Sequence, residues 1–490
     1  MTDYLELMNK EGTFAYYFKK ISEVPRGSYN NREISDKLVE FAKKRGLRYI
    51  QDESLNVVIY KDASKGFEEC APVIIQGHMD MVCEKAADSN HDFVSQGLCL
   101  EHDDKYIYAK DTTLGADDGI AVAYALAILD DDSLMHPSLE VVITTDEEVG
   151  MDGAKALDTS VLKGKYMLNL DSEDEGLFLT GCAGGLDVNV ELKASYCEAK
   201  GKLMTIEVGG LKGGHSGSEI DKNRTNADIL LGRILNELRK EYFRINLACV
   251  RGGNKDNVIP CASFAKLIVD ERMSGIEECL DKVTKTIKAE LASSEPDLCI
   301  RYSFEEGEWE KVFSTDCERN IIRYLMVVPD GVIKMSSDIE GLVETSLNLG
   351  IMETKEDSII FVHSVRSSVE SCKYSVYDRL CTAADCVGGT AKAVSSYPGW
   401  KYEKDSKLRE TAVALYEQTE HKSAIVTAIH AGLECGLIKD KMPDLDIISY
   451  GPDIKDIHTV NERMDMESAI RVYDFTVELI KRIGELEIQA

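Results

Sequence analysis

The sequence predicts an α/β domain, with a mostly parallel sheet flanked by helices, which is interrupted by an inserted α+β domain. In the first third of the chain, short apolar runs typical of buried strands alternate with helical patterns. Examples in chain order are the run PVIIQ at residues 72–76, the helical stretch at residues 120–130 and the run LEVVIT at residues 139–144. An order of strand, helix and strand favours a parallel sheet with helices on both faces.

From about Gly185 the pattern changes to alternating polar and apolar residues between long amphipathic helices. A similar order of strands and helices recurs from LCIRYSFEE at residues 298–306. We therefore expect the inserted domain to consist of two α+β units in tandem, with roughly a hundred residues in each. The α/β pattern returns after Tyr397. The expected boundaries are residues 1–184 and 397–490 for the α/β domain and residues 185–396 for the inserted domain.

The composition excludes several classes of partner. The 490 residues include 57 Lys and Arg against 87 Asp and Glu, which gives a formal net charge of -30. Such a charge repels phosphate backbones and anionic lipid, so we expect neither nucleic acid nor a membrane as a partner. The chain has no apolar run near the ~18 residues that span a bilayer, and its N-terminus does not resemble a signal peptide. Its 14 cysteines form no C-x-x-C pair, so we expect a cytoplasmic protein with reduced thiols.

Residues able to bind a metal ion follow several of the expected strands. His78 closes a strand in the motif QGHMD, and Asp80, two positions later, is placed to orient its imidazole. Five further candidates complete the set: Asp117 before a helix in TLGADDG, Glu147 and Glu148 in TTDEEVG, Asp171 in NLDSE, and His458 in HTVNE.

Each of these residues also has an ordinary structural explanation. His78 could be a hydrogen-bonded histidine at a strand end, Asp117 could cap the following helix, and the two glutamates could belong to a solvated acidic cluster. Their joint position is the stronger signal, because the ligands of one site in an open α/β sheet lie at the carboxyl ends of strands. We expect the two histidines and the four acids to meet at that edge.

The residue types indicate the kind of metal. Two imidazoles and several carboxylates, without a nearby thiolate, suit divalent ions such as zinc, cobalt or manganese. Five ligands and a spare carboxylate exceed the needs of one tetrahedral ion. The pattern therefore favours two divalent ions, with Asp117 bridging them.

Other chemistries find little support in the sequence. GGHSG at residues 213–217 lacks the spacing of a phosphate-binding loop, and no G-x-G-x-x-G motif suggests a dinucleotide. No G-x-S-x-G motif is present either, which argues against a nucleophilic serine.

Taken together, these motifs resemble those of the cytosolic non-specific dipeptidases, also called aminoacyl-histidine dipeptidases. This family belongs to the clan of zinc aminoacylases and carboxypeptidases. The resemblance extends from VPRGSYN near the N-terminus to the final helix, and it includes QGHMD, TLGADDG, TTDEEVG, NLDSE, GCAGG, GGHSG and HTVNE in family order. It implies that His78, Asp117 and Asp171 hold one ion, most simply zinc, and that Asp117, Glu148 and His458 hold the other.

The resemblance also implies catalytic roles. Glu147 would be the general base that activates a water bridging the two metal ions, and Asp80 would orient His78. The peptide bond between Asp117 and Asp118 would be cis, a form that is rare outside proline.

The inserted domain is expected to be a lid that completes the active site. The resemblance implies that His215 in GGHSG stabilises the oxyanion, and that Asn257 in DNVIP and Arg366 in HSVRSS bind the substrate. Gly432 in HAGLECG, which we assign to the catalytic domain, corresponds to a backbone position that contacts the substrate. Without the resemblance, His215 would be read as a histidine of a glycine-rich turn and Arg366 as a surface charge at a strand end.

The implied activity is the hydrolysis of unblocked dipeptides, including those of the Xaa-His (β-alanyl-histidine) type. One alternative is another hydrolase of the same clan, such as a tripeptidase or an N-acyl-amino-acid deacylase. A more distant one is a non-catalytic protein that binds metal or peptide, which the presence of Glu147 and every ligand disfavours. The sequence leaves the choice between a monomer and a homodimer open.

Overall fold

The computed structural model describes residues 4–305 and 311–489 and divides the chain into two compact units. The α/β unit comprises the chain up to Gly181, Tyr402–Ala428 and the chain from Leu433 onward. The inserted unit comprises Cys182–Lys401 together with Ile429–Gly432. We expected Gly432 in the α/β domain, but it lies in the inserted unit. The reason is local pairing, because the Ala183 N–H donates to the carbonyls of Ile429 and Ala431 at 3.1 and 2.9 Å.

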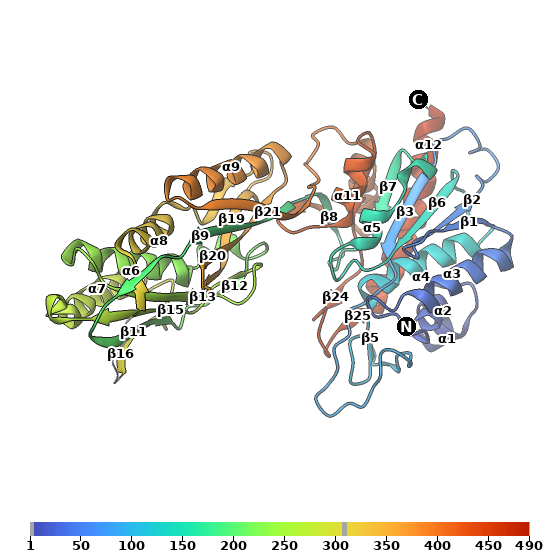
Figure 1. Cartoon of the computed structure of the whole chain (residues 1–490). Coiled ribbons are helices and arrows are strands. Elements are labelled where there is room, and N and C mark those ends of the chain that lie inside the picture. Colours follow the sequence, from blue (N-terminus) through green and yellow to red (C-terminus); the bar gives the residue numbers. More distant parts are fainter. Residues whose placement is uncertain (1–3, 306–310, 490) are drawn as a thin grey trace. The chain divides into compact units, whose positions relative to one another are not determined.

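An eight-stranded sheet forms the centre of the α/β unit (Figure 1). Its order is β1 (Arg48–Gln51), β2 (Val57–Lys61), β6 (Leu139–Thr144), β3 (Val73–His78), β7 (Tyr166–Asn169), β23 (Asp446–Ser449), β8 (Leu177–Cys182) and β22 (Ile425–Ile429). The four strands β6, β3, β7 and β23 are mutually parallel. The pairs β1–β2, β2–β6 and β23–β8 are antiparallel, so the sheet is mixed and its parallel part is confined to the centre.

Helices cover this sheet and bury its apolar side chains. Those of the α/β unit are α1 (Tyr4–Asn9), α2 (Phe14–Ser22), α3 (Arg32–Arg45), α4 (Ala116–Asp130), α5 (Asp152–Ala156), α10 (Lys407–Glu420), α11 (Glu434–Lys441) and α12 (Met466–Gln489). Helix α4 is buried from Ala116 to Leu129 because it is apolar on every side and packs against both β3 and α2.

A second, four-stranded sheet lies within the α/β unit. Its order is β24 (Ile454–Lys455), β25 (Arg463–Asp465), β5 (Tyr106–Ala109) and β4 (Leu100–His102). Asp117 lies beyond β5, and His458 lies in the loop between β24 and β25. The expectation that all six candidate ligands follow strands of the parallel sheet is therefore wrong for these two.

The inserted unit contains one nine-stranded sheet. Along the sheet the order is β16 (Cys299–Glu305), β11 (Lys202–Gly209), β15 (Ser263–Val269), β13 (Leu247–Gly252), β19 (Val343–Thr354), β20 (Ser358–Ser367), β9 (Gly184–Lys193) and β21 (Thr390–Tyr397), and β18 (Gly331–Met335) pairs with β19. The helices α6 (Ala227–Glu241), α7 (Ile276–Glu290), α8 (Thr315–Val327) and α9 (Glu370–Cys386) share its apolar core.

Two α+β halves are present in this unit, but they are nested and not in tandem. The first half follows the order β11, α6, β13, β15, α7, β16, and the second follows β9, α8, β19, β20, α9, β21. The run LCIRYSFEE was expected to open the second half. Its described part forms β16 over Cys299–Glu305 and closes the first half by pairing with β11, and its last residue lies outside the described residues. The second half begins instead with β9, before the first half, and the pairing of β13 with β19 joins the two.

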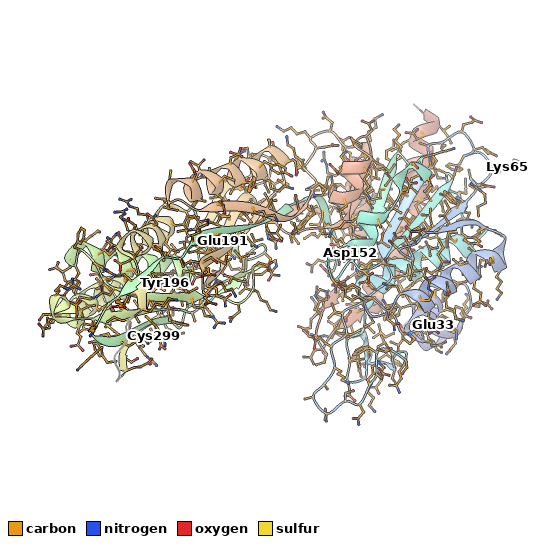
Figure 2. All side chains as sticks on the ribbon, viewed as in Figure 1. Glu33, Lys65, Asp152, Glu191, Tyr196 and Cys299 are labelled. Carbon is orange, nitrogen blue, oxygen red and sulfur yellow. The ribbon has the colours of Figure 1, made fainter. Side chains whose placement is uncertain are left out.

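Strand β9 illustrates how the sequence places the two faces of this sheet. Val188, Val190 and Leu192 are buried, whereas the alternate residues Asn189 and Glu191 are exposed, and Glu191 is labelled on this strand in Figure 2. This alternation follows from the period of two residues in a β-strand.

Over residues 4–305 and 311–489, every helix is too short or too polar to cross a bilayer.

Candidate metal centre and substrate-binding cluster

The neighbouring parallel strands β6, β3 and β7 carry the first part of the candidate metal centre. His78 is the last residue of β3, and Asp171 follows β7 by two positions. Glu147 and Glu148 lie just beyond Thr144, the last residue of β6. Because parallel strands end at the same edge of the sheet, their polar side chains meet there.

Asp117 and His458 reach the same place by other routes. Asp117 lies at the start of α4, whose first residues pass the end of β3, as the hydrogen bond from the His78 N–H to Asp118 Oδ2 shows (3.2 Å). The His458 side chain comes from the loop after β24 and is the most exposed member of the group, at 44%. The peptide bond between Asp117 and Asp118 is cis, which confirms that expectation.

The carboxylate of Asp117 lies between the two imidazoles. Its Oδ1 is 3.2 Å from His78 Nε2, and its Oδ2 is 3.1 Å from His458 Nε2. On the two outer sides, Asp171 Oδ1 lies 3.6 Å from His78 Nε2 and Glu148 lies 3.1 Å from His458 Nε2. One oxygen per imidazole is the arrangement that a carboxylate shared by two ions requires.

Within residues 4–305 and 311–489, three sets of ligand atoms could hold an ion, and the atoms of each set lie within 4.8 Å of one another. They are Asp117 with Glu148 and His458, His78 with Asp118 and Asp171, and His78 with Glu147 and Glu148. Asp118 thus appears where the resemblance implied Asp117. Its carboxylate already accepts the His78 N–H, whereas both Asp117 oxygens face imidazoles, so the contacts favour Asp117 as the ligand.

The candidate metal centre contains several carboxylates, and their negative charges favour the binding of cations. Hydrogen bonds to Asp117 and Glu148 raise the pKa of His458 to about 11. Burial, together with the negative charge of Asp117, raises the pKa of Asp171 and of Glu148 above the usual range. Carboxylates crowded in this way repel one another, and a divalent cation would relieve that repulsion. The donor set of imidazoles and carboxylates therefore fits two divalent ions of the zinc, cobalt or manganese type.

Asp80 links His78 to the acidic loop after β6. Its Oδ1 lies 3.4 Å from His78 Nδ1 and accepts the Glu147 N–H at 3.1 Å, while its Oδ2 accepts the Ser28 hydroxyl at 2.8 Å. Burial disfavours the charge on Asp80, but the hydrogen bonds from His78, Ser28 and the Glu147 N–H outweigh it and lower the pKa of Asp80. A charged Asp80 can therefore fix the orientation of His78.

Glu147 has the opposite electrostatic character. Burial, together with the charges of Asp171, Glu434 and Glu148, raises its pKa well above that of an ordinary glutamate. A carboxylate in this environment accepts a proton readily, which suits a general base.

Glu434 is a fully buried acid that the sequence analysis did not single out. Its Oε2 accepts hydrogen bonds from Gln76 Nε2 and Thr144 Oγ1, both at 2.6 Å. Burial raises its pKa to about 7. The only sequence signal was its place in the quoted motif HAGLECG.

All four candidate residues outside the metal centre gather within the inserted unit. The short strand β12 (Gly214–His215) pairs with β14 (Val258–Ile259), and the Ser216 N–H donates to the Asn257 carbonyl at 2.9 Å. Burial of the His215 imidazole lowers its pKa most, and the nearby positive charge of Arg366 lowers it further. Gly432 lies against the Tyr397 ring, to whose hydroxyl Arg366 Nη1 donates at 3.2 Å.

The tautomer of His215 follows from its hydrogen bonds. Its Nδ1 accepts from the N–H groups of Gly217 and Ser218 at 3.2 and 3.1 Å. The proton of a neutral His215 is therefore on Nε2, which can donate to an oxyanion. Burial and the charge of Arg366 lower its pKa and favour this neutral form.

Tyr397 and His430 belong to the same cluster and were missed from the sequence. The backbone carbonyl of His430 packs against Gly217. The imidazole Nε2 of His430 lies 2.7 Å from Ser346 Oγ. The buried Nε of Arg366 and Nδ1 of His430 have no hydrogen-bond partner within the described part of the chain. The Nε–H group of Arg366 is a donor and needs an acceptor, which a carboxylate would supply.

The chain is similar to several known proteins. The model of peptidase family M20/M25/M40 matches residues 74–482. The cytosol non-specific dipeptidase of Escherichia coli is 35% identical over 470 residues, which cover 95% of this chain and 96% of that protein. The crystal structure of an aminoacylhistidine dipeptidase from Vibrio alginolyticus superposes with a TM-score of 0.91 and 34% identity over 98% of both chains. The aminopeptidase PepT of Bacillus cereus shares the fold, with a TM-score of 0.60 at 17% identity over 97% of this chain and all of that one.

Proposed function

Because the chain belongs to peptidase family M20/M25/M40, we propose that it is a metal-dependent dipeptidase that hydrolyses unblocked dipeptides, Xaa-His dipeptides among them. The observation that carries the proposal is the Asp117 carboxylate, placed between His78 and His458 with one oxygen toward each imidazole. The names of the Escherichia coli and Vibrio alginolyticus relatives support the substrate class.

We assign the metal ligands as two sets that share Asp117. His78, Asp117 and Asp171 would hold one divalent ion, and Asp117, Glu148 and His458 the other. Zinc suits this donor set best, and cobalt or manganese would be accepted by the same ligands. When bound, the ions would supply Lewis-acid chemistry, polarising the scissile carbonyl and making a water acidic near neutral pH.

The chain's own residues divide the remaining work. Glu147 takes a proton from the attacking water and later delivers it to the leaving amine. Asp80 keeps His78 in one orientation through the contact at Nδ1. His215 donates from Nε2 to the developing oxyanion, a contribution that is typically ~10²–10³ in rate.

We assign recognition of the substrate's free carboxylate to the cluster in the inserted unit. The guanidinium of Arg366 matches the geometry of a carboxylate, and Asn257 and the backbone at Gly432 complete the contacts. Holding the carboxylate at a fixed distance from the scissile bond restricts the enzyme to very short peptides. We also place the protein in the cytoplasm, in keeping with the name of the Escherichia coli relative.

A substrate panel tests this proposal. Protein freed of metal with a chelator is supplied with zinc, cobalt or manganese and offered dipeptides, tripeptides, N-acetylated amino acids and dipeptide amides. We expect turnover of the unblocked dipeptides alone, and only after metal is restored. Preferred cleavage of tripeptides or of acylated amino acids would contradict the proposal and assign the chain to another activity of the clan.

A further inference from the structure

Two motifs that carry the family resemblance contain buried charged residues without an assigned role. Arg26 lies in VPRGSYN and Glu462 lies in HTVNE, and each is only 2% exposed. Charged residues are rarely this buried unless their hydrogen-bonding groups are satisfied. Their partners therefore indicate what they do.

Glu462 holds the loop that leads to the shared metal ligand. Its Oε2 accepts the backbone N–H groups of Leu114 and Gly115 at 2.8 and 2.9 Å, and its Oε1 accepts that of Ala116 at 2.8 Å. Three successive N–H groups thus converge on one carboxylate. Asp117 is the next residue along the chain, so this carboxylate sets the position from which the Asp117 side chain extends.

Arg26 holds the same loop from the other side. Its Nη2 donates to the Gly115 carbonyl, and its Nη1 donates to the carbonyls of Met79 and Asp80 at 3.2 and 3.3 Å. The peptide groups of Gly115 are therefore bound by Glu462 through the N–H and by Arg26 through the carbonyl. Arg26 also connects this loop to the segment that carries His78 and Asp80.

The glycines of TLGADDG make room for this arrangement. Gly115 has φ of 63°, in the left-handed region that favours glycine. A methyl group there would lie 2.7 Å from Arg26 Nη2, and one at Gly119 would lie 2.5 Å from the same atom. The spacing of the motif thus reflects the passage of a guanidinium between the loop and helix α4.

We propose that Arg26 and Glu462 are positioning residues, which fix the Asp117 and Asp80 carboxylates in the geometry that binds two metal ions. This inference rests on the proposed function only in that Asp117 is taken as a metal ligand. Both residues bind backbone groups of the loop, and neither is among the assigned metal ligands. Partners that orient metal ligands in this way commonly contribute ~10–100-fold to metal affinity.

A matched control is present at the other end of the same helix. Lys61 Nζ donates to the carbonyls of Ile128, Leu129 and Asp131 at 3.2, 3.1 and 2.9 Å, and its side chain is only 8% exposed. It is a buried charge that binds three backbone groups of α4 and its C-terminal end, far along the helix from Asp117. A purely structural role for Glu462 would make Glu462→Gln and Lys61→Met behave alike.

The experiment measures Co²⁺ binding to metal-free protein by competition with a chromophoric chelator, together with the visible absorption spectrum of the bound Co²⁺ and the thermal midpoint. We expect Glu462→Gln to weaken Co²⁺ binding by ~10–100-fold and to change the absorption bands. Lys61→Met should lower the thermal midpoint while leaving the affinity and spectrum as in wild type. Wild-type affinity and spectrum in Glu462→Gln would overturn the proposal.

A second variant covers the case in which Glu462→Gln does not fold. Glu462→Asp keeps the charge but is one methylene shorter, so it cannot reach all three N–H groups at once. If both variants are soluble, we expect the Co²⁺ affinity of Glu462→Asp to lie between those of wild type and Glu462→Gln. If only Glu462→Asp is soluble, we expect its Co²⁺ affinity to be lower than that of wild type. Wild-type affinity in Glu462→Asp, with Glu462→Gln unfolded, would assign the pair a structural role only. Since no substrate is used, inactivity toward dipeptides would contradict the proposed function without altering this result.

Discussion

Replacing Glu147 with glutamine separates the general base from the metal ligands. The Glu147 N–H donates to Asp80 Oδ1 and the Glu148 N–H to Asp80 Oδ2, at 3.1 and 3.4 Å. These bonds involve the backbone and remain in Glu147→Gln, and the amide has nearly the same size and shape as the carboxylate. The substitution therefore removes the ability to accept a proton and little else.

The size of the expected loss follows from the environment of Glu147. Burial and the surrounding acids raise its pKa well above the ordinary value, so the Glu147 carboxylate is a stronger base than an exposed glutamate. General acid–base catalysis is typically worth ~10²–10⁴ in rate, or about 3 to 5 kcal/mol of activation free energy. We expect the turnover number of Glu147→Gln to fall by that factor.

The assay compares turnover at saturating dipeptide with the metal content of each purified variant. Glu147→Gln should retain the wild-type metal content. Glu148→Gln is the matched control, because Glu148 lies 3.1 Å from His458 Nε2 and its substitution should cost one of the two ions. If Glu147→Gln lost metal while Glu148→Gln kept it, the roles of the two neighbours would be reversed.

Four further outcomes are expected. Metal analysis of zinc-reconstituted protein should approach two ions per chain and chelators should abolish activity, whereas a firm value of one would remove the bridging role of Asp117. His215→Ala should lower turnover by ~10²–10³ at unchanged metal content and thermal midpoint, and wild-type turnover would exclude the oxyanion role. Arg366→Ala should raise KM for dipeptides more than for dipeptide amides, and equal effects on both would argue against carboxylate recognition. Burial lowers the pKa of His363 to about 3 from 6.5, so the unfolded chain alone binds this proton between those values and stability falls as the pH drops through that range. Hydrogen exchange of β20 should show this loss, about 1.4 kcal/mol per pH unit, in wild type and not in His363→Gln, and equal slopes would contradict it.

The sequence pattern explains the position of the candidate ligands at the ends of β3, β6 and β7. Each of these strands is a short apolar run followed at once by residues able to bind metal, such as His78 and Asp171. An apolar run and the polar residues at its end are both visible in one sequence. The parallel order then brings the ends together without further information.

Asp117 and His458 lie beside the other candidate ligands, but not for the reason that the sequence suggested. Neither follows a strand of the parallel sheet, since both depend on the small sheet of β24, β25, β5 and β4. That sheet consists of strands of two to four residues. Strands this short have too few residues for alternation to be read from the sequence.

The nested order of the inserted unit was beyond sequence reasoning for a different reason. Strand β9 pairs with β20 and β21, which follow it in the chain by more than 160 residues. Its alternating pattern is equally compatible with pairing to its neighbour in sequence. Local patterns predict that a strand exists but do not choose its partner, because that choice depends on packing across the whole sheet.

Gly185 in GCAGG and Gly432 in HAGLECG both lie against a side chain that neither motif contains. Methyl groups at Gly185 and Gly432 would both overlap the ring of Tyr397, and the hydroxyl of that ring accepts from Arg366. The two motifs are more than 240 residues apart, yet both leave space for one tyrosine that orients one arginine. Tyr397 carries no motif of its own beyond the turn that follows it, so a sequence shows the two spaces and not the side chain that fills them. The sequence therefore related Gly432 alone to the substrate, and Tyr397, which links both glycines to Arg366, emerged only from the packing.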